Sequence, residues 1–242
     1  MTPPHIVKAF DQDLQALTDG IGAMGNFAAM QFAEAVQALL SGDPELAARV
    51  VAQDRELDTL RRDLSAAAAR VIARRQPLAN DLEEVMTDFR IVEDLERVGD
   101  LAKNIAKRAK VIATAGLPPD LVQGFARLAA LAGNQLRDAL ATYLARDAER
   151  ALSVRKQDEK LDEAHTGVFR DIVACMDADQ NQVIGFVHLL FCAKNVERVG
   201  DHATHIAEAA YQRAKGHPPE DERQRLDRSS LLGAGEPDDT ES

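Results

Sequence analysis

The chain carries the sequence ERVGDLAK at residues 96–103 and the sequence ERVGDHAT at residues 197–204. The shared ERVGD core places a glutamate and an aspartate four residues apart in each copy, Glu96 with Asp100 and Glu197 with Asp201. On a helix, residues at i and i+4 lie on one face, about 5–6 Å apart. Two carboxylates held that close repel each other unless a positive group lies between them. The repeated pair therefore predicts helices whose acids share a bound cation.

The duplication extends well beyond this core. With an offset of 104 residues, the pairs Asp54/Asp58 and Asp158/Asp162 match, and with an offset of 101 residues Asn80 matches Asn181. Similarity at a fixed period is the mark of an internal repeat. We therefore predict an all-α fold of two tandem three-helix bundles with six long helices. The expected units are residues 1–115 and 116–215, followed by a disordered acidic tail at 216–242.

Composition agrees with this fold class and excludes several functions. Apolar residues make up 45% of the chain and aromatic residues only 4%, with no Trp, which favours packed helices over sheets. The net charge of −11 argues against nucleic-acid binding, which requires a basic surface. The longest apolar run, residues 183–193, is too short to span a membrane. Without a signal peptide, Cys175 and Cys192 are expected to be reduced thiols in a soluble, cytoplasmic protein.

Helix ends can be placed from proline, glycine and capping residues. Asp43 is the expected N-cap of the second helix and Asp147 that of the fifth, and Pro77 ends the second. The third helix is predicted over 78–113, the fourth from the 116–120 linker to 145, the fifth to 177 and the sixth over 181–214. Three glycines within residues 19–25 predict a bend or fraying in the first helix, because each costs about 1 kcal/mol relative to Ala.

The third helix shows one apolar stripe with steps of three and four residues. The acids Glu96 and Asp100 continue a column beside that stripe, so they should face a neighbouring helix. The stripe consists of Leu82, Val85, Phe89, Val92, Leu95, Val98, Ala102, Ile105, Ala109 and Ile112.

The neighbouring helix of each unit offers a second acidic pair. Asp54 and Asp58 would join the first site, and Asp158 and Asp162 the second, so four carboxylates could bind hard cations through oxygen. Gly99 and Gly200 lie between the paired acids, where a missing side chain leaves room at the site.

A purely structural network is the alternative to a metal site. In that interpretation Arg97 and Arg198 neutralise the acids. Histidines are a weaker indication: His202 and His205 lie near the second site, but Leu101 and Asn104 replace them in the first. No motif for catalysis is present, neither a phosphate-binding glycine loop nor a nucleophile or metalloprotease signature.

The two segments ERVGDLAKNIA (96–106) and ERVGDHATHIA (197–207) resemble the paired signature of PhoU, the bacterial phosphate-uptake regulators. The resemblance covers residues 5–215. It implies two three-helix bundles and acidic motifs that bind metal, with iron, zinc, manganese or magnesium as candidates. The ligand residues it implies are Glu96, Asp100, Glu197 and Asp201, with Asp54, Asp58, Asp158 and Asp162.

Similarity to this family also implies a regulatory role and its partners. Such a protein is a cytoplasmic adaptor, peripheral at the inner membrane, between the ATPase subunit of a phosphate ABC transporter and a phosphate-sensing histidine kinase. It keeps the starvation response off when phosphate is plentiful, and we expect it to be a homodimer. Two alternatives stay open: a carboxylate-bridged metalloenzyme on a helical bundle, or an accessory protein of a low-affinity phosphate transporter.

Overall fold

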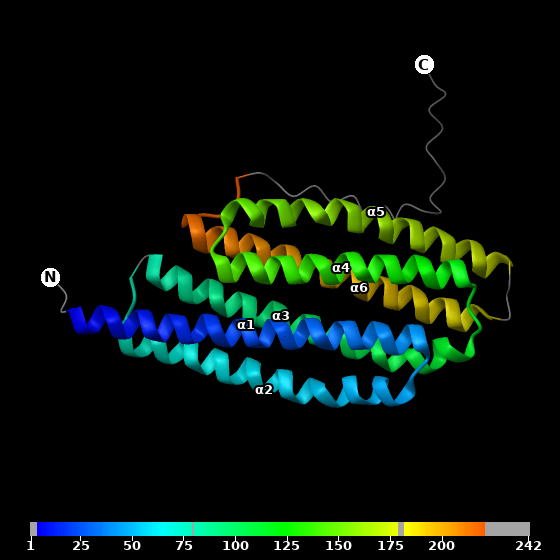
Figure 1. Cartoon of the computed structure of the whole chain (residues 1–242), viewed down its shortest axis with the longest axis horizontal. Coiled ribbons are helices and arrows are strands. Elements are labelled where there is room, and N and C mark those ends of the chain that lie inside the picture. The colour runs from blue at the N-terminus through cyan, green and yellow to red at the C-terminus, as the bar shows by residue number, and fades with distance from the viewer. Residues whose placement is uncertain (1–3, 79, 179–181, 221–242) are drawn as a thin grey trace, which may run out of the picture.

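The computed structural model describes residues 4–78, 80–178 and 182–220, and these form six long helices (Figure 1). No strand occurs in those ranges, so the all-α prediction is confirmed. Most of the predicted acidic tail, residues 221–242, lies outside the described part. The helices are α1 (Pro4–Ser41), α2 (Pro44–Arg75), α3 (Asn80–Thr114), α4 (Pro119–Ala145), α5 (Ala148–Ala178) and α6 (Val183–Lys215).

Helix ends follow the local signals in the sequence. The Asp43 carboxylate accepts hydrogen bonds from the backbone N–H groups of Glu45 (2.9 Å) and Leu46 (3.0 Å), which makes it the N-cap of α2. Asp147 accepts one from the N–H of Arg150 at 3.0 Å at the start of α5. Since these bonds form between close sequence neighbours, both capping predictions are confirmed.

The fraying predicted for the first helix is wrong, because α1 runs without interruption through its three glycines. A Cβ atom at Gly20 would lie 2.5 Å from Leu64 Cδ2 of α2, and one at Gly25 would lie 2.4 Å from Leu140 Cδ2 of α4. The glycines therefore let α1 approach two neighbouring helices closely. Tertiary packing of this kind outweighs a low helix propensity.

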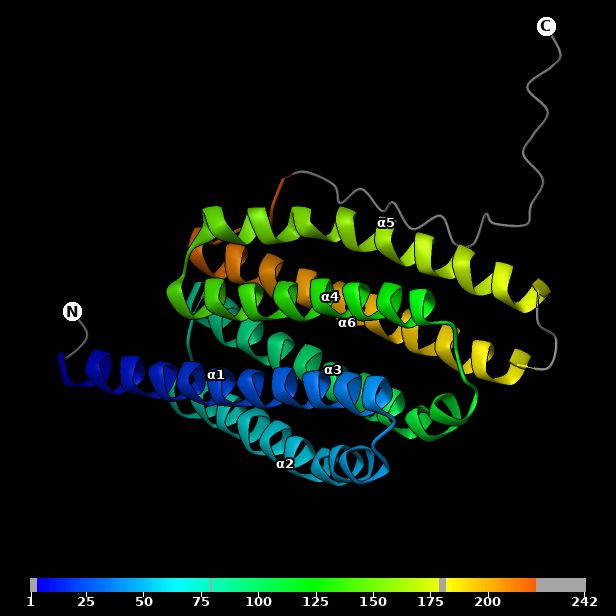
Figure 2. The same ribbon diagram turned by 45° about the vertical axis from the view of Figure 1, so that its right-hand side comes forward.

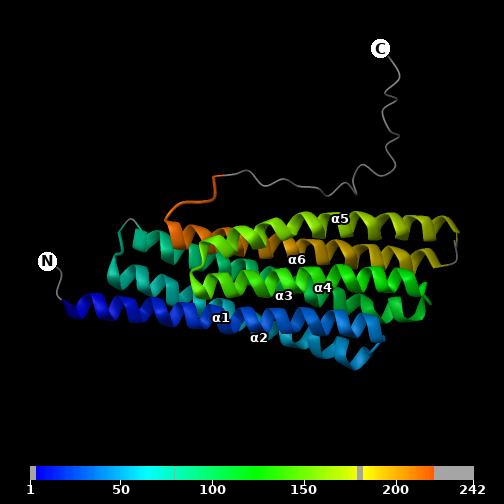
Figure 3. The same cartoon turned by 45° about the horizontal axis from the view of Figure 1, so that its top comes forward.

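The two halves pack side by side and share one core. Helices α1–α3 form one three-helix unit and α4–α6 the other, with α3 against α6 and α1 against α4. The long axes of all six helices follow the long axis of the molecule in Figure 1, and the turned views in Figures 2 and 3 show the same arrangement. One cluster of buried apolar residues takes members from every helix. The repeats are therefore joined by a continuous hydrophobic core.

The predicted stripe of α3 is largely correct. Its members from Val92 to Ile112 are buried, as is Val85, whereas Leu82 and Phe89 are each 37% exposed. Leu82 and Phe89 stand fourteen and seven positions before Glu96 and belong to its column, which lies outside the buried stripe. Phe89 lines a cavity between α3 and α6 instead of entering the core.

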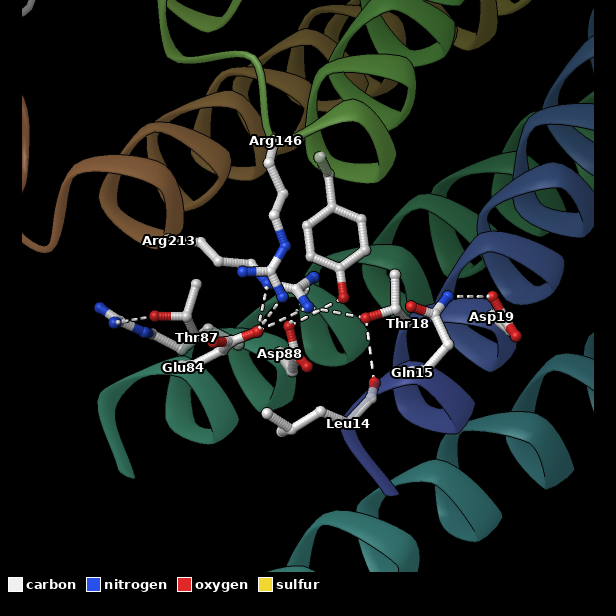
Figure 4. A network of polar contacts seen from close by, with 11 residues as sticks. Leu14, Gln15, Thr18, Asp19, Glu84, Thr87, Asp88, Arg146 and Arg213 are labelled. Carbon is white, nitrogen blue, oxygen red and sulfur yellow. Dashed lines mark hydrogen bonds and ion pairs between the residues drawn. The ribbon is translucent and has the colours of Figure 1, made fainter. Parts of the chain in front are cut away.

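A buried polar network connects the halves near one end of the bundle (Figure 4). The Arg213 guanidinium of α6 lies 2.8 Å from Glu84 of α3, donates to the Thr18 hydroxyl of α1 at 2.7 Å, and lies 3.4 Å from the Asp88 carboxylate. Its central carbon stands 4.6 Å from the ring centroid of Tyr143 in α4. The Tyr143 hydroxyl donates to Asp88 at 2.8 Å. Side chains from four helices thus fix the relative position of the two units.

Burial disfavours the ionised form of the Asp88 carboxyl group. Its side chain is almost fully buried, and burial raises the pKa of Asp88 to about 6, although the Arg213 charge and the Tyr143 hydrogen bond act in the opposite direction. Sequence analysis did not find this network, because its members are separated by up to 195 positions along the chain.

Candidate acidic sites and a histidine cluster

The first acidic site lies between α2 and α3 and contains an internal cation. The Lys103 ammonium lies 2.7 Å from Asp54 of α2 and 2.6 Å from Asp100 of α3. Arg97 lies 3.6 Å from Glu96 and 3.5 Å from Asp100. The structure therefore joins Asp54, Asp100 and Glu96 in one ion-pair network with Lys103 and Arg97. Asp58, the fourth predicted ligand, is exposed.

Charge and burial act together on this site. Burial and the nearby Asp100 carboxylate raise the pKa of Glu96. Burial would lower the pKa of Lys103, but hydrogen bonds to Asp100 and Asp54 outweigh it and raise the pKa above its ordinary value. Within the described residues, Glu96 Oε2 is buried and accepts no hydrogen bond. This oxygen can therefore accept a hydrogen bond or bind a cation.

The second acidic site, between α5 and α6, is more deeply buried. Asp158, Asp162 and Glu197 are all buried, and Asp201 is half-buried. Threonine at position 204 takes the place that Lys103 holds in the first motif. Its hydroxyl donates to Asp158 at 3.0 Å and accepts a hydrogen bond from Gln135 at 2.8 Å.

A lysine of the second site contacts the motif glutamate. Lys194 lies 2.9 Å from Glu197, whereas Lys103 of the first site bridges Asp54 and Asp100. The lysines of the two copies thus contact different acids.

The two motif glycines do not leave space for a ligand, and that prediction is wrong. A Cβ atom at Gly99 would lie 2.0 Å from Leu57 Cδ2, and one at Gly200 would lie 1.9 Å from Leu161 Cδ2. Each leucine lies one residue before the second aspartate of its acidic pair and fills the room that the glycine provides. The glycines therefore bring the two acid-bearing helices of each unit into close contact.

The described residues contain one group of three potential metal ligands whose donor atoms all lie within 4.8 Å of one another, and it is Asp94, His202 and His205. Asp94 comes from α3 and both histidines come from α6. The two histidines were predicted to lie near the second acidic site, and nothing local in the sequence links Asp94 to positions more than 100 residues away.

The fold and the sites together define a duplicated, all-helical protein with one acid-rich motif in each half. The family model described as the PhoU domain matches this chain twice, at residues 21–109 and 125–210. The chain belongs to the PhoU family, as the resemblance of its paired motifs predicted.

Relatives agree with this assignment over nearly the full length. The chain is 45% identical over 234 residues to the "phosphate-specific transport system accessory protein PhoU homolog" of Rhizobium meliloti, covering 97% of this chain and 99% of the relative. A protein of the same name from Caulobacter vibrioides is 39% identical, with 92% and 97% covered. The crystal structure of PhoU from Pseudomonas aeruginosa superposes with a TM-score of 0.82 at 30% identity, covering 86% of this chain and 100% of that one. The first two relatives are named as accessory proteins, and none of the three names denotes an enzyme.

Proposed function

We propose that this chain is a regulatory accessory protein of a phosphate ABC transporter. The observation that supports this most directly is the near full-length similarity to proteins named as accessory to phosphate-specific transport. In this proposal the chain works in the cytoplasm, at the inner membrane, and contacts the ATPase subunit of the transporter and a phosphate-sensing histidine kinase. It restrains uptake and the starvation response when phosphate is abundant.

Binding is a sufficient physical means for such regulation. A protein that binds one conformation of a kinase or transporter more tightly shifts the population toward that conformation by its differential affinity. No described helix is long and apolar enough to cross a bilayer, so contact with the transporter would come through its protein subunits. In a homodimer, which the resemblance implies, two copies of the chain would be available to bind these partners.

We also propose that the paired carboxylates bind metal ions. Glu197, Asp158 and Asp162, with Asp201, offer a buried oxygen-rich set in the second copy, which suits iron, manganese, zinc or magnesium. In the first copy Glu96, with Asp54, Asp58 and Asp100, would be the ligands. A metal there must replace the Lys103 ammonium between Asp54 and Asp100. In the second copy a metal would likewise replace the Lys194 ammonium at Glu197, and the oxygen donors of both copies suit a hard cation.

Deleting the gene and following a reporter for phosphate-starvation genes tests the regulatory proposal. We expect the reporter to stay active in phosphate-rich medium, and a plasmid copy of the wild-type chain to restore repression. A variant with Glu96, Asp100, Glu197 and Asp201 all changed to Ala shows whether the acids are needed. Normal repression in the deletion strain, with no second copy of such a gene present, would contradict the proposal.

A further inference from the structure

The α3–α6 contact holds a second kind of site, separate in position and chemistry from the paired acids. Asp94 Oδ1 lies 2.8 Å from Nδ1 of His202 and 3.5 Å from Nδ1 of His205. The two imidazole rings are nearly perpendicular, with their centroids 5.8 Å apart. One carboxylate oxygen thus faces two ring nitrogens that approach from different directions.

These separations are close to those of a coordination sphere. Zinc and similar metals bind imidazole nitrogen and carboxylate oxygen at about 2.0–2.2 Å, which puts neighbouring ligand atoms about 3.3–3.5 Å apart in a tetrahedral site. The Asp94–His205 distance already has this value, and the Asp94–His202 distance needs less than about 1 Å of change. We propose that Asp94, His202 and His205 form a binding site for one divalent transition metal, such as zinc, that joins α3 to α6.

The chemistry of the ligands favours a borderline metal over magnesium or calcium. Two imidazoles and one carboxylate suit zinc, iron(II), cobalt or nickel, whereas magnesium and calcium prefer oxygen throughout. Metal binding requires the carboxylate in its ionised form and one unprotonated nitrogen on each imidazole, so the affinity of this site should fall at acid pH.

The cluster also leaves coordination positions open to solvent. Asp94 and His205 line a cavity of about 510 Å³ whose wall includes Glu93 and Glu208. Asp94 and His202 are largely buried, while His205 is exposed. A metal could enter from this cavity and complete its coordination with water. Glu93 and Glu208 lie next to Arg61 and Arg155, at 3.4 Å and 2.9 Å.

The duplication supplies an internal control for this proposal. With the 101-residue offset, Asp94 corresponds to Asn195, and His202 and His205 correspond to Leu101 and Asn104. The matching position on the other side of the α3–α6 contact therefore has no charged or imidazole ligand. Only one such site exists in the described part of the chain, in contrast to the two acidic sites.

The experiment is a calorimetric titration of chelator-treated, full-length protein with zinc ions near neutral pH. We compare the wild type with H202Q, H205Q and D94N, with N104Q as the matched control in the other repeat. We expect one zinc ion per chain at this site, and a loss of roughly tenfold or more in its affinity in each ligand variant, since even changes behind a ligand cost 10–100-fold. N104Q should bind as the wild type does.

Cobalt(II) provides a second readout, because its visible absorption depends on its coordination geometry and on the ligand atoms around it. The spectrum should be lost in H205Q, whose exposed position makes misfolding a poor explanation, and kept when Glu96, Asp100, Glu197 and Asp201 are changed to Ala. Zinc affinity and cobalt spectra unchanged in both histidine variants would overturn the proposal. So would binding that disappears only with the four acids, which would assign the ion to the acidic sites. Neither result depends on the regulatory proposal.

Discussion

Replacing Asp88 with Asn should flatten the dependence of stability on pH. The folded-state pKa of Asp88 is about 6 instead of its ordinary 3.8, because the carboxyl is buried. The folded chain therefore binds this proton more tightly than the unfolded chain. Protonation of Asp88 therefore adds to the free energy of unfolding. This contribution is fully present below about pH 3.8 and is lost as the pH rises through about 6. A shift of this size corresponds to about 3 kcal/mol over the whole range.

Only part of this range can be measured in practice. The isoelectric point is near 5.0, where low net charge reduces solubility, so the useful range lies above it. From about pH 7.5 to about pH 5.5, protonation of Asp88 contributes about 0.8 kcal/mol to the free energy of unfolding. Urea unfolding followed by circular dichroism, at several pH values, can resolve that difference. Contributions from the other carboxylates cancel when D88N is compared with the wild type.

The expected result is a smaller stability gain on acidification in D88N than in the wild type, by about 0.8 kcal/mol across that interval. Tyr143→Phe is the control, because it removes a hydrogen bond that lowers the Asp88 pKa. That variant should move the transition to higher pH and increase its amplitude over the full titration, because the folded-state pKa moves further from the unfolded-state value. Equal slopes in D88N and the wild type would show that burial does not raise the Asp88 pKa, and the reasoning would fail.

Four further variants test the packing and the charges. Arg213→Met should lower the free energy of unfolding by about 3–5 kcal/mol in denaturant titrations, because it leaves the buried Asp88 carboxylate without its cation and removes one of the two arginines at Glu84. Gly200→Ala should destabilise by about 1–3 kcal/mol, since its Cβ would lie 1.9 Å from a leucine methyl group. Gly167→Ala, with nothing within 4 Å, should instead raise the melting temperature slightly. Lys103→Thr should increase metal affinity at the first acidic site in calorimetry, because it removes the competing ammonium; unchanged affinity would contradict a metal there.

Features that depend on neighbouring residues could be predicted from the sequence, and features that depend on distant ones could not. The caps at Asp43 and Asp147 are local hydrogen bonds, so side-chain chemistry and spacing were enough to place them. The glycines of α1 were misinterpreted because local propensity predicts fraying. The reason that the helix runs without interruption is the approach of Leu64 and Leu140 from other helices.

At the acidic sites, too, contacts within one helix could be predicted from the sequence and contacts between helices could not. The pairing of Glu96 with Asp100 follows from helical spacing, and so does the nearness of Lys103 to Asp100. The bridge from Lys103 to Asp54, and the contact between Asp94 and His202, depend on how helices are placed in space. A signal for the bridge was present, because position 103 is a lysine and the matching position 204 is a threonine. Only the fold shows what this difference does.

The continuous core has a consequence for the ancestry of the chain. A single three-helix repeat would expose the apolar face that α3 now buries against α6, and a second copy of the repeat is a partner of the right shape to cover it. A symmetric pair of identical repeats carries each off-axis contact between them twice. Within the described residues the cluster of Asp94 with two histidines occurs once, so the two fused halves differ at this contact in a way that two identical repeats could not.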